Sequence, residues 1–258
     1  MQYRTIRLDI ADGIATVTLN RPEVMNALDT QMRAEITHAV TAAEAEARVI
    51  VMTGEGRAFC SGQDLGDGGN ATKLDLERTL RDEYVPMLRA ITRCKVPTIA
   101  AVNGPAAGAG ANLALAADVV IASDAAYFVQ AFTRIGLIPD AGGTWTLPRQ
   151  IGMARAMGAS LFADRIDAVQ AAEWGMIYES VGADAFVAHW RARAAHLATG
   201  PTAAYGHLKE ALRASPGNTL DQQLTLEAQL QGQCGQTRDF REGVVAFMEK
   251  RTAAFEGR

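Results

Sequence analysis

The sequence predicts an α/β protein in which short apolar strands alternate with helices, followed by a C-terminal region of helices alone. Three similar apolar runs, at 48–54, 98–104 and 118–123, indicate the strands of the core. The first two runs each lead into small residues and then a helical segment. This weak repetition is typical of stacked strand–helix units, arranged as a spiral or a doubly wound sheet. Beyond about residue 151 strand signals nearly vanish, and 176–181 is the last candidate.

The N-terminal half carries local signals for its strands and helices. Residues 3–19 alternate between apolar and polar side chains around Asp12-Gly13, a pair typical of a tight hairpin turn. Residues 29–45 have apolar side chains at helical spacing, with Asp29 or Thr30 as a suitable N-cap. The next stretches are predicted to be a glycine-rich loop and a helix, at 54–71 and 72–92.

The last third of the chain is predicted to be helical. No linker, charge block or low-complexity segment separates two independent domains. The predicted elements nevertheless divide the chain into an α/β core over 1–195 and a helical region appended to it over 196–258. The helices are expected at 184–198, 202–214, 219–233 and 238–250. The helices carry more apolar positions than one small domain needs to cover its sheet, which predicts self-association. These positions are Leu220, Leu224, Leu226, Leu230, Val244 and Phe247.

Composition and charge disfavour several classes of protein. The 258 residues include 25 Lys and Arg against 29 Asp and Glu, a net charge of −4, so no basic excess indicates nucleic-acid binding. No apolar run approaches the roughly 20 residues of a membrane span, and the N-terminus has no apolar signal core. Cys60, Cys94 and Cys234 are far apart and cannot all pair with one another, which favours a reducing cytosol over secretion.

Familiar catalytic and metal motifs are missing from the sequence. It contains no GxxxxGK[ST], HExxH, CxxC or GxSxG pattern. His189 and His196 could share a helix face, but two ligands without a third make no catalytic zinc site, so no metal is expected. Gly108-x-Gly110 follows a strand as in a dinucleotide fingerprint, but the third glycine and the early position in a first βαβ unit are missing.

Two small-residue segments, each directly after a predicted strand, suggest a place for a ligand oxygen. In 104–112 the small residues either let a helix pack close to the sheet or leave backbone N–H groups at the helix start facing a ligand. In 58–65, Gly62 allows the backbone to turn and point the Gln63 N–H outward. Two such N–H groups brought to one point form an oxyanion hole.

A third segment, 136–144, holds one carboxyl between apolar Ile138 and a Gly-Gly pair. Asp140 is either the cap of a helix over 144–150, a turn residue, or a catalytic group. In the catalytic interpretation, apolar surroundings raise the pKa of the carboxyl by desolvation, as a general base requires.

Four motifs, in order along the chain, resemble those of the crotonase superfamily, the enoyl-CoA hydratase/isomerase family. They are LNRPEVMNAL at 19–28, AFCSGQDL at 58–65, AAVNGPAAGAGAN at 100–112 and GLIPDAGGT at 136–144. REGVVAFMEKR at 241–251 is similar to the family's last helix, and the likeness runs from about residue 5 to 255. It implies a crotonase-like spiral of ββα turns, a C-terminal trimerisation region, a homotrimer or dimer of trimers, and coenzyme A thioester substrates. Coenzyme A is then part of the substrate, and no separate cofactor is expected.

The resemblance implies roles for individual residues. The two oxyanion donors fall on the backbone N–H groups of Gln63 and Ala109, which would hold the thioester oxygen as it becomes an enolate. Phe247 and Lys250 match family positions that approach the nucleotide end of CoA, sometimes across a subunit boundary, with core packing and a solvated surface as the alternatives. Further substrate contacts are implied for Val24, Asn26, Ala27, Ser61, Asp64, Leu65 and Gly108.

The sequence departs from the hydratases of this family at two positions. Their two glutamates, which handle one water, fall on Asn112 and Phe132, and neither residue can act as a general acid or base. Both are still expected at the substrate, where the Phe132 ring would exclude water and favour a bulky or aromatic acyl group. Asp140 remains, at a position where family members with a carboxylate move a double bond or, in one branch, attack an aromatic ring.

The segment 130–145 most resembles the branch that converts the ring-1,2-epoxide of phenylacetyl-CoA to its oxepin form and shifts double bonds in related CoA esters. We therefore expect a cytoplasmic acyl-CoA isomerase with Asp140 as its single acid/base, and no nucleic-acid or membrane partner. The alternatives are a generic enoyl-CoA hydratase of fatty-acid β-oxidation, an aryl-CoA dehalogenase, and a non-catalytic CoA-thioester binder. Dehalogenation usually needs a histidine base as well, and no His occurs from 39 to 188.

Overall fold

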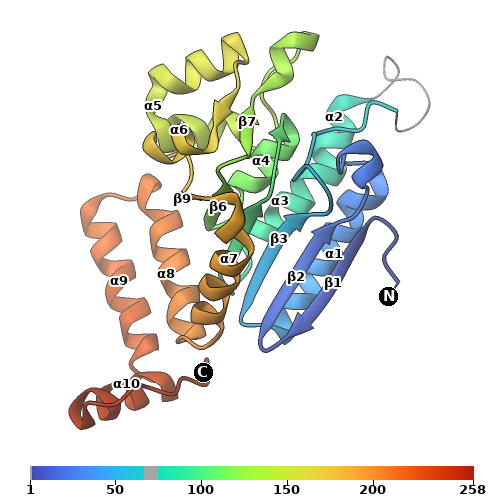
Figure 1. The fold of residues 1–258 in the computed structure, drawn as a ribbon. Helices are drawn as coiled ribbons and strands as arrows, with labels where there is room; N and C mark the ends of the chain where they lie inside the picture. The colour runs from blue at the N-terminus through green and yellow to red at the C-terminus, as the bar shows by residue number, and fades with distance from the viewer. Residues whose placement is uncertain (1, 67–74) are drawn as a thin grey trace.

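A six-stranded sheet forms the centre of the fold in the computed structural model, which describes residues 2–66 and 75–258 (Figure 1). Its strands lie in the order β1-β2-β3-β4-β6-β9; β1 and β2 are antiparallel and the other neighbours are parallel. The strands are β1 (Ile6–Ala11), β2 (Ile14–Leu19), β3 (Val49–Gly54), β4 (Thr98–Val102), β6 (Val119–Ser123) and β9 (Glu179–Val181). The predicted hairpin is confirmed, and Asp12 and Gly13 both have the positive φ of a type I′ turn.

Helices cover both faces of this sheet and continue into the C-terminal region. The first helix begins at the predicted cap, where the Met32 N–H donates to Asp29 Oδ1 over 2.7 Å. Residues 67–71 of the predicted loop and 72–74 of the predicted helix lie outside the described residues. The helices are α1 (Thr30–Glu46), α2 (Leu76–Thr79), the π-helical turn η3 (Leu80–Tyr84), α3 (Val85–Thr92), α4 (Ala109–Leu115), the 3₁₀ turn η4 (Ala131–Ile135), α5 (Gly143–Phe162), α6 (Ala168–Glu173), α7 (Ala183–Ala198), α8 (Thr202–Ala214), α9 (Leu220–Cys234) and α10 (Arg238–Glu249).

A second layer of very short strands, which the sequence does not predict, turns the fold into a spiral. β5 (Ala106–Ala107) pairs in parallel with β7 (Tyr127–Val129), which pairs with β8 (Ile166–Asp167). Isolated parallel bridges extend this layer, joining Cys60 to Ala106 and Leu28 to Gln63. Each turn of the spiral thus contributes one strand to the main sheet and a short strand or a bridge residue to the second layer. A helix then leads to the next turn. Of the two arrangements left open by the sequence, the structure has the spiral.

The inner strands β3, β4 and β6 are mostly apolar because the sheet is covered on both faces. Successive side chains of a strand point to opposite faces, so Ile50 and Met52 of β3 join the main core with α1, α3 and α4. Val49 and Val51 lie on the other face with Phe186 of α7. Because α7 packs on the sheet and runs through residue 195, the predicted boundary at 195/196 falls inside a core helix. The helices that leave the sheet begin at α8.

The C-terminal helices extend from the core and are tied to it by charge (Figure 1). On α8, Lys209 Nζ lies 2.6 Å from Asp118 Oδ2, and Arg213 Nη2 donates to Asp118 Oδ1 over 2.7 Å. Large apolar side chains remain exposed on these helices, among them Leu212, Leu220, Leu224 and Phe247. Among the helices of the described chain, none is both long and apolar enough to span a bilayer.

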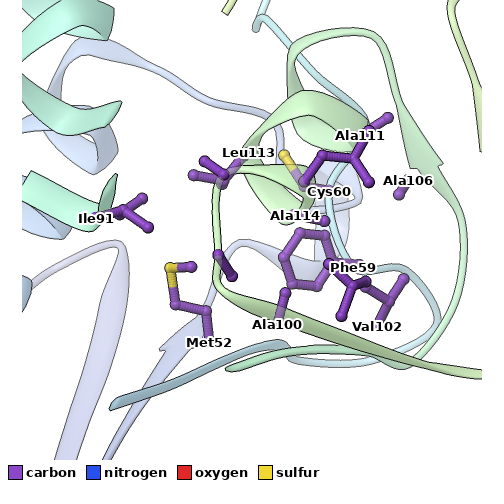
Figure 2. Packing of buried hydrophobic residues seen from close by; sticks show 14 of the residues in the cluster. Met52, Phe59, Cys60, Ile91, Ala100, Val102, Ala106, Ala111, Leu113 and Ala114 are labelled. Carbon is purple, nitrogen blue, oxygen red and sulfur yellow. The ribbon is translucent and has the colours of Figure 1, made fainter. Parts of the chain in front are cut away.

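The main core is packed most closely where α4 meets the segment after β3. Figure 2 shows Phe59 and Cys60 beside Ala111, Leu113 and Ala114 of α4. Gly110 lies at this contact, and a Cβ built on it would be 2.3 Å from the Cys60 carbonyl oxygen and 2.7 Å from its Sγ. Only glycine fits at this helical position, since the neighbouring atoms include Cys60 backbone that cannot move aside.

Replacing Gly110 by alanine should therefore destabilise the fold by overpacking, by roughly 1–3 kcal/mol or more. Gly158, inside α5, is the matched control because a Cβ there meets no atom within 4 Å. Gly158→Ala should be neutral or stabilise the protein by up to about 1 kcal/mol through helix propensity. Urea unfolding of both variants measures the difference; equal midpoints would contradict the close packing at α4.

Candidate active site

A cavity of about 280 Å³ lies between the 61–65 loop, the start of α4, η3 and η4. Its walls are mainly apolar and include Leu80, Phe132 and Leu137. Gly108, Ser61 and Leu65 also line it, as the sequence predicts, and Asp140 is the one carboxylate among the described residues of its wall. The cavity therefore combines a mainly apolar, acyl-sized space with one carboxyl group among the described residues of its wall.

Two backbone N–H groups at this cavity have no protein acceptor among the described residues. In the Leu28–Gln63 bridge, the Leu28 N–H donates to Gly62 O and the Leu28 carbonyl accepts from the Asp64 N–H. The Gln63 N–H therefore points away from Leu28. Ala109 is the first residue of α4, where N–H groups have no partner within a helix. Gly62 has φ +98°, and a Cβ there would lie 3.5 Å from Ala109 N. The two donors therefore lie on loops in direct contact.

The side chain of Gln63 is held by a buried network that the sequence analysis missed. Gln63 Oε1 accepts from Tyr84 Oη over 2.7 Å and from Arg33 Nη1 over 2.9 Å. Arg33 is 1% exposed, donates to Leu28 O over 2.6 Å and pairs with Glu83 at 2.6 Å. Arg33 therefore contacts both sides of the bridge that orients the Gln63 N–H. A helical Arg at position 33 carries no local signal for this role, because Gln63 and Glu83 are 30 and 50 residues away.

Asp140 lies in a tight turn immediately before α5. Its carbonyl accepts from the Gly143 N–H over 2.8 Å, with positive φ at Ala141 and Gly142. Its side chain makes no capping bond to α5, so the turn interpretation is correct and the cap interpretation is wrong. Oδ1 is buried and has no hydrogen-bond partner in the described chain, and burial raises the pKa of Asp140 from 3.8 to about 6. At neutral pH such a carboxyl is ionised but readily accepts a proton.

Asn112 and Phe132 occupy different places relative to the cavity. Phe132 of η4 is 6% exposed and forms part of the wall. Asn112 of α4 is 2% exposed and lies behind the wall, where its Nδ2 donates to the Asp140 carbonyl over 2.8 Å. The expected contact of Asn112 with substrate is therefore replaced by a contact with the loop of Asp140.

The further substrate contacts expected at Val24, Asn26, Ala27 and Asp64 divide into exposed and internal positions. Asn26 is fully buried and donates to the carbonyls of Glu55 and Ala58, so it holds its loop together rather than facing a ligand. Ala27 is also buried. Val24 is 38% exposed, and its carbonyl accepts from Ser61 Oγ. Asp64 is paired with Arg21 at 2.9 Å.

Phe247 and Lys250 lie on and just after α10, at the opposite end of the molecule from the cavity (Figure 1). Phe247 is 85% exposed and borders a separate groove with Phe240 and Phe255. The alternative of a solvated position is right for Lys250, which is exposed. The alternative of core packing is wrong for Phe247. Within one chain neither residue joins the Asp140 site.

Cys60 lies directly before the 61–65 loop of the Asp140 cavity. It is fully buried, and burial raises the pKa of its thiol to about 12, although the Gly62 N–H lowers it in part. A thiol that stays protonated and has no access to the cavity is a packing residue.

A spiral that brings two unpaired backbone N–H groups and one desolvated carboxyl to an acyl-sized cavity defines an enzyme of the crotonase class. Comparison with known proteins agrees. The profile of the enoyl-CoA hydratase/isomerase family matches residues 9–258. The chain belongs to this family, whose enzymes act on acyl-CoA thioesters.

Relatives with different names cover essentially the whole chain. A probable enoyl-CoA hydratase of Rhodobacter capsulatus is 63% identical over 258 residues, covering 100% of both chains. The 1,2-epoxyphenylacetyl-CoA isomerase of Escherichia coli is 44% identical over 254 residues, covering 96% of this chain and 97% of that protein. The solved structure of an enoyl-CoA hydratase subunit from Geobacillus kaustophilus superposes with a TM-score of 0.93 at 33% identity, covering 100% of both chains.

The raised pKa of Asp140 makes a prediction about stability. A carboxyl with a higher pKa in the folded state lowers the free energy of unfolding as pH rises from about 4 to about 6, and the penalty is complete above that range. Asp140→Asn should therefore be more stable than the wild type at pH 8, by roughly 1–3 kcal/mol, with a smaller gain at pH 4.5. Urea unfolding at both pH values measures this. The exposed Asp9→Asn is the control and should show no such gain; a gain at Asp140 independent of pH would refute the electrostatic cause.

Proposed function

We propose that the protein is an acyl-CoA isomerase that moves a proton between carbons of a thioester enolate. The single observation that carries this proposal is the unpaired Oδ1 of Asp140, desolvated in the cavity that the two free N–H groups border. The Asp140 carboxylate would remove a proton from a carbon next to the double bond. The thioester oxygen would take up the negative charge and accept hydrogen bonds from Gln63 and Ala109. The carboxyl would then return the same proton to a different carbon.

This reaction needs one acid/base group and conserves every atom of the substrate, so we propose no resident cofactor or metal. A wall of Leu80, Phe132 and Leu137 favours a bulky or aromatic acyl group. The 44% identity to the Escherichia coli epoxyphenylacetyl-CoA isomerase supports a substrate with a ring-epoxide or an unsaturated acyl chain. We further propose a cytoplasmic enzyme without a nucleic-acid or membrane partner.

Hydration of an enoyl-CoA is the second candidate, because the 63% identical relative carries that name. Hydration requires one group to deprotonate water and one to protonate the α-carbon. In the described wall of the cavity Asp140 is alone as a carboxylate, and the Asn112 amide is turned to the Asp140 carbonyl instead. A pure CoA-thioester binder is the third candidate, but it has no use for a desolvated carboxyl that lowers stability.

Isomerisation should exceed crotonyl-CoA hydration by at least roughly 100-fold, the usual contribution of a second positioned acid/base group. Turnover of phenylacetyl-CoA epoxide, cis-3-enoyl-CoA and crotonyl-CoA by the wild type measures this ratio.

Asp140→Asn should abolish isomerisation while CoA-ester binding is nearly unchanged, since the oxygen is held by backbone donors. The same three substrates, tested with this variant, measure the loss of turnover.

Because Asp140 acts as a base when ionised, kcat/KM for isomerisation should rise with pH and level off above a pKa of about 6. The pH profile of the wild type measures this.

Cys60→Ala serves as the control, since it alters the same loop without touching the proton transfer, and it should retain most of the activity. Fast crotonyl-CoA hydration by the wild type would favour the hydratase. Full isomerase activity in Asp140→Asn would exclude Asp140 as the base. Tight binding of the esters without turnover would favour the binder.

We also propose that the chain forms a trimer or a dimer of trimers through its C-terminal helices. Leu212 and Leu220 are 63% and 73% exposed, and Phe247 on α10 is 85% exposed, which is more apolar surface than a monomer keeps in water. Light scattering at micromolar concentration should give three or six times the chain mass of 27.5 kDa. A clean monomer mass would contradict this assembly.

A further inference from the structure

Within the described chain, only its own backbone orients the Asp140 carboxyl. Oδ1 is buried without a hydrogen-bond partner there, and the other carboxylate oxygen has no side-chain hydrogen bond in the same part of the chain. An acid/base group must nevertheless be held close to its target geometry, because small misplacements of a reacting group reduce rate strongly. The orientation of this carboxyl therefore depends on how firmly the peptide unit of Asp140 is fixed.

Two hydrogen bonds fix that peptide unit at its carbonyl. The Gly143 N–H donates to Asp140 O over 2.8 Å across a turn with φ 48° at Ala141 and 85° at Gly142. A left-handed backbone is unfavourable for alanine, so such a turn persists only when its surroundings hold it. The second bond comes from outside the turn, where Asn112 Nδ2 donates to the same carbonyl over 2.8 Å.

The Asn112 amide is itself fixed on every side. Its Oδ1 accepts from Gln130 Nε2 over 2.9 Å, and its Nδ2 lies 3.3 Å from Gln130 Oε1. Asn112 is 2% exposed and Gln130 is fully buried. A Cβ on Gly143 would lie 2.4 Å from Asn112 Nδ2, so this glycine leaves the space through which the amide reaches the turn.

We propose that Asn112 is a positioning residue for Asp140, supported by its amide pair with Gln130. Its role is to donate one hydrogen bond to the Asp140 carbonyl, which orients the turn so that the carboxyl enters the cavity. The inference rests on the proposed function only in taking Asp140 as the acid/base. The two members of the amide pair have different roles. Asn112 contacts the turn of Asp140 directly, whereas Gln130 contacts Asn112.

Three variants separate positioning from simple structural support. Asn112→Leu keeps a similar shape but removes the donor. Gln130→Met removes the supporting amide and leaves the bond from Asn112 to Asp140 in place. The double variant Asn112→Leu/Gln130→Met replaces both amides by apolar groups, which leaves no orphaned side-chain amide in the pair and can be nearly neutral for stability.

Stability and turnover should respond differently across these variants. Each single variant should lower the urea midpoint, and the double variant should regain most of it. In Asn112→Leu and in the double variant, kcat for isomerisation should fall by roughly 10- to 100-fold, with KM within about threefold of the wild type. In Gln130→Met, kcat should stay within about threefold. A structural role alone would make kcat follow stability instead.

Three results would overturn the proposal: an unchanged kcat in Asn112→Leu, an equal loss of kcat in Gln130→Met, or recovery of kcat together with stability in the double variant. Asp140→Asn is measured alongside. If that variant stays active, the proposed function fails first. If it is inactive while Asn112→Leu keeps its kcat, the proposed function stands and only the role of Asn112 is wrong.

Discussion

The close approach of two backbone segments, the loop after β3 and the start of α4, is the constraint on which the site depends. Glycine is required at this contact because the neighbouring atoms are backbone: Cβ atoms on Gly62 and Gly110 would lie 2.8 Å from Ala107 O and 2.3 Å from Cys60 O. Without this approach the N–H groups of Gln63 and Ala109 would not face one cavity. The helix start adds its partial positive charge at the same place. The small residues of the two motifs are therefore a geometric requirement of the spiral.

The mainly apolar walls of the cavity make those groups effective and also make them costly. Desolvation raises the pKa of Asp140 to about 6, and the same desolvation strengthens any hydrogen bond from Gln63 and Ala109 to a developing negative charge. Beside the site, the other buried charge is paired. Arg33 is the one fully buried cation there in the described chain, and it pairs with Glu83 and donates to the carbonyl of Leu28. The buried guanidinium of Arg33 is thus paired, whereas Oδ1 of Asp140 has no hydrogen-bond partner in the described chain.

The sequence predicts the features whose causes are local. The hairpin turn at Asp12-Gly13, the cap at Asp29 and the mostly apolar strands β3, β4 and β6 follow from turn chemistry, capping and two-sided burial, and the structure has all of them. It does not predict β5, β7 and β8, because strands of two or three residues show no periodicity. The position of Asp140 in a turn follows from its glycine neighbours, whereas the partners of Asn112 and Arg33 lie far away in sequence and appear only after folding.

Asn112 shows how one substitution can change both the chemistry and the architecture of a site. By its resemblance to the family, this position carries a glutamate in the hydratases, where the side chain handles water. An amide in the same place cannot move a proton, but unlike an ionised carboxylate it can donate to a carbonyl. In this chain that donor reaches the Asp140 carbonyl, and Gly143 leaves the space it needs. Under the proposed mechanism, the residue that removes the machinery for hydration also holds the group that carries out isomerisation.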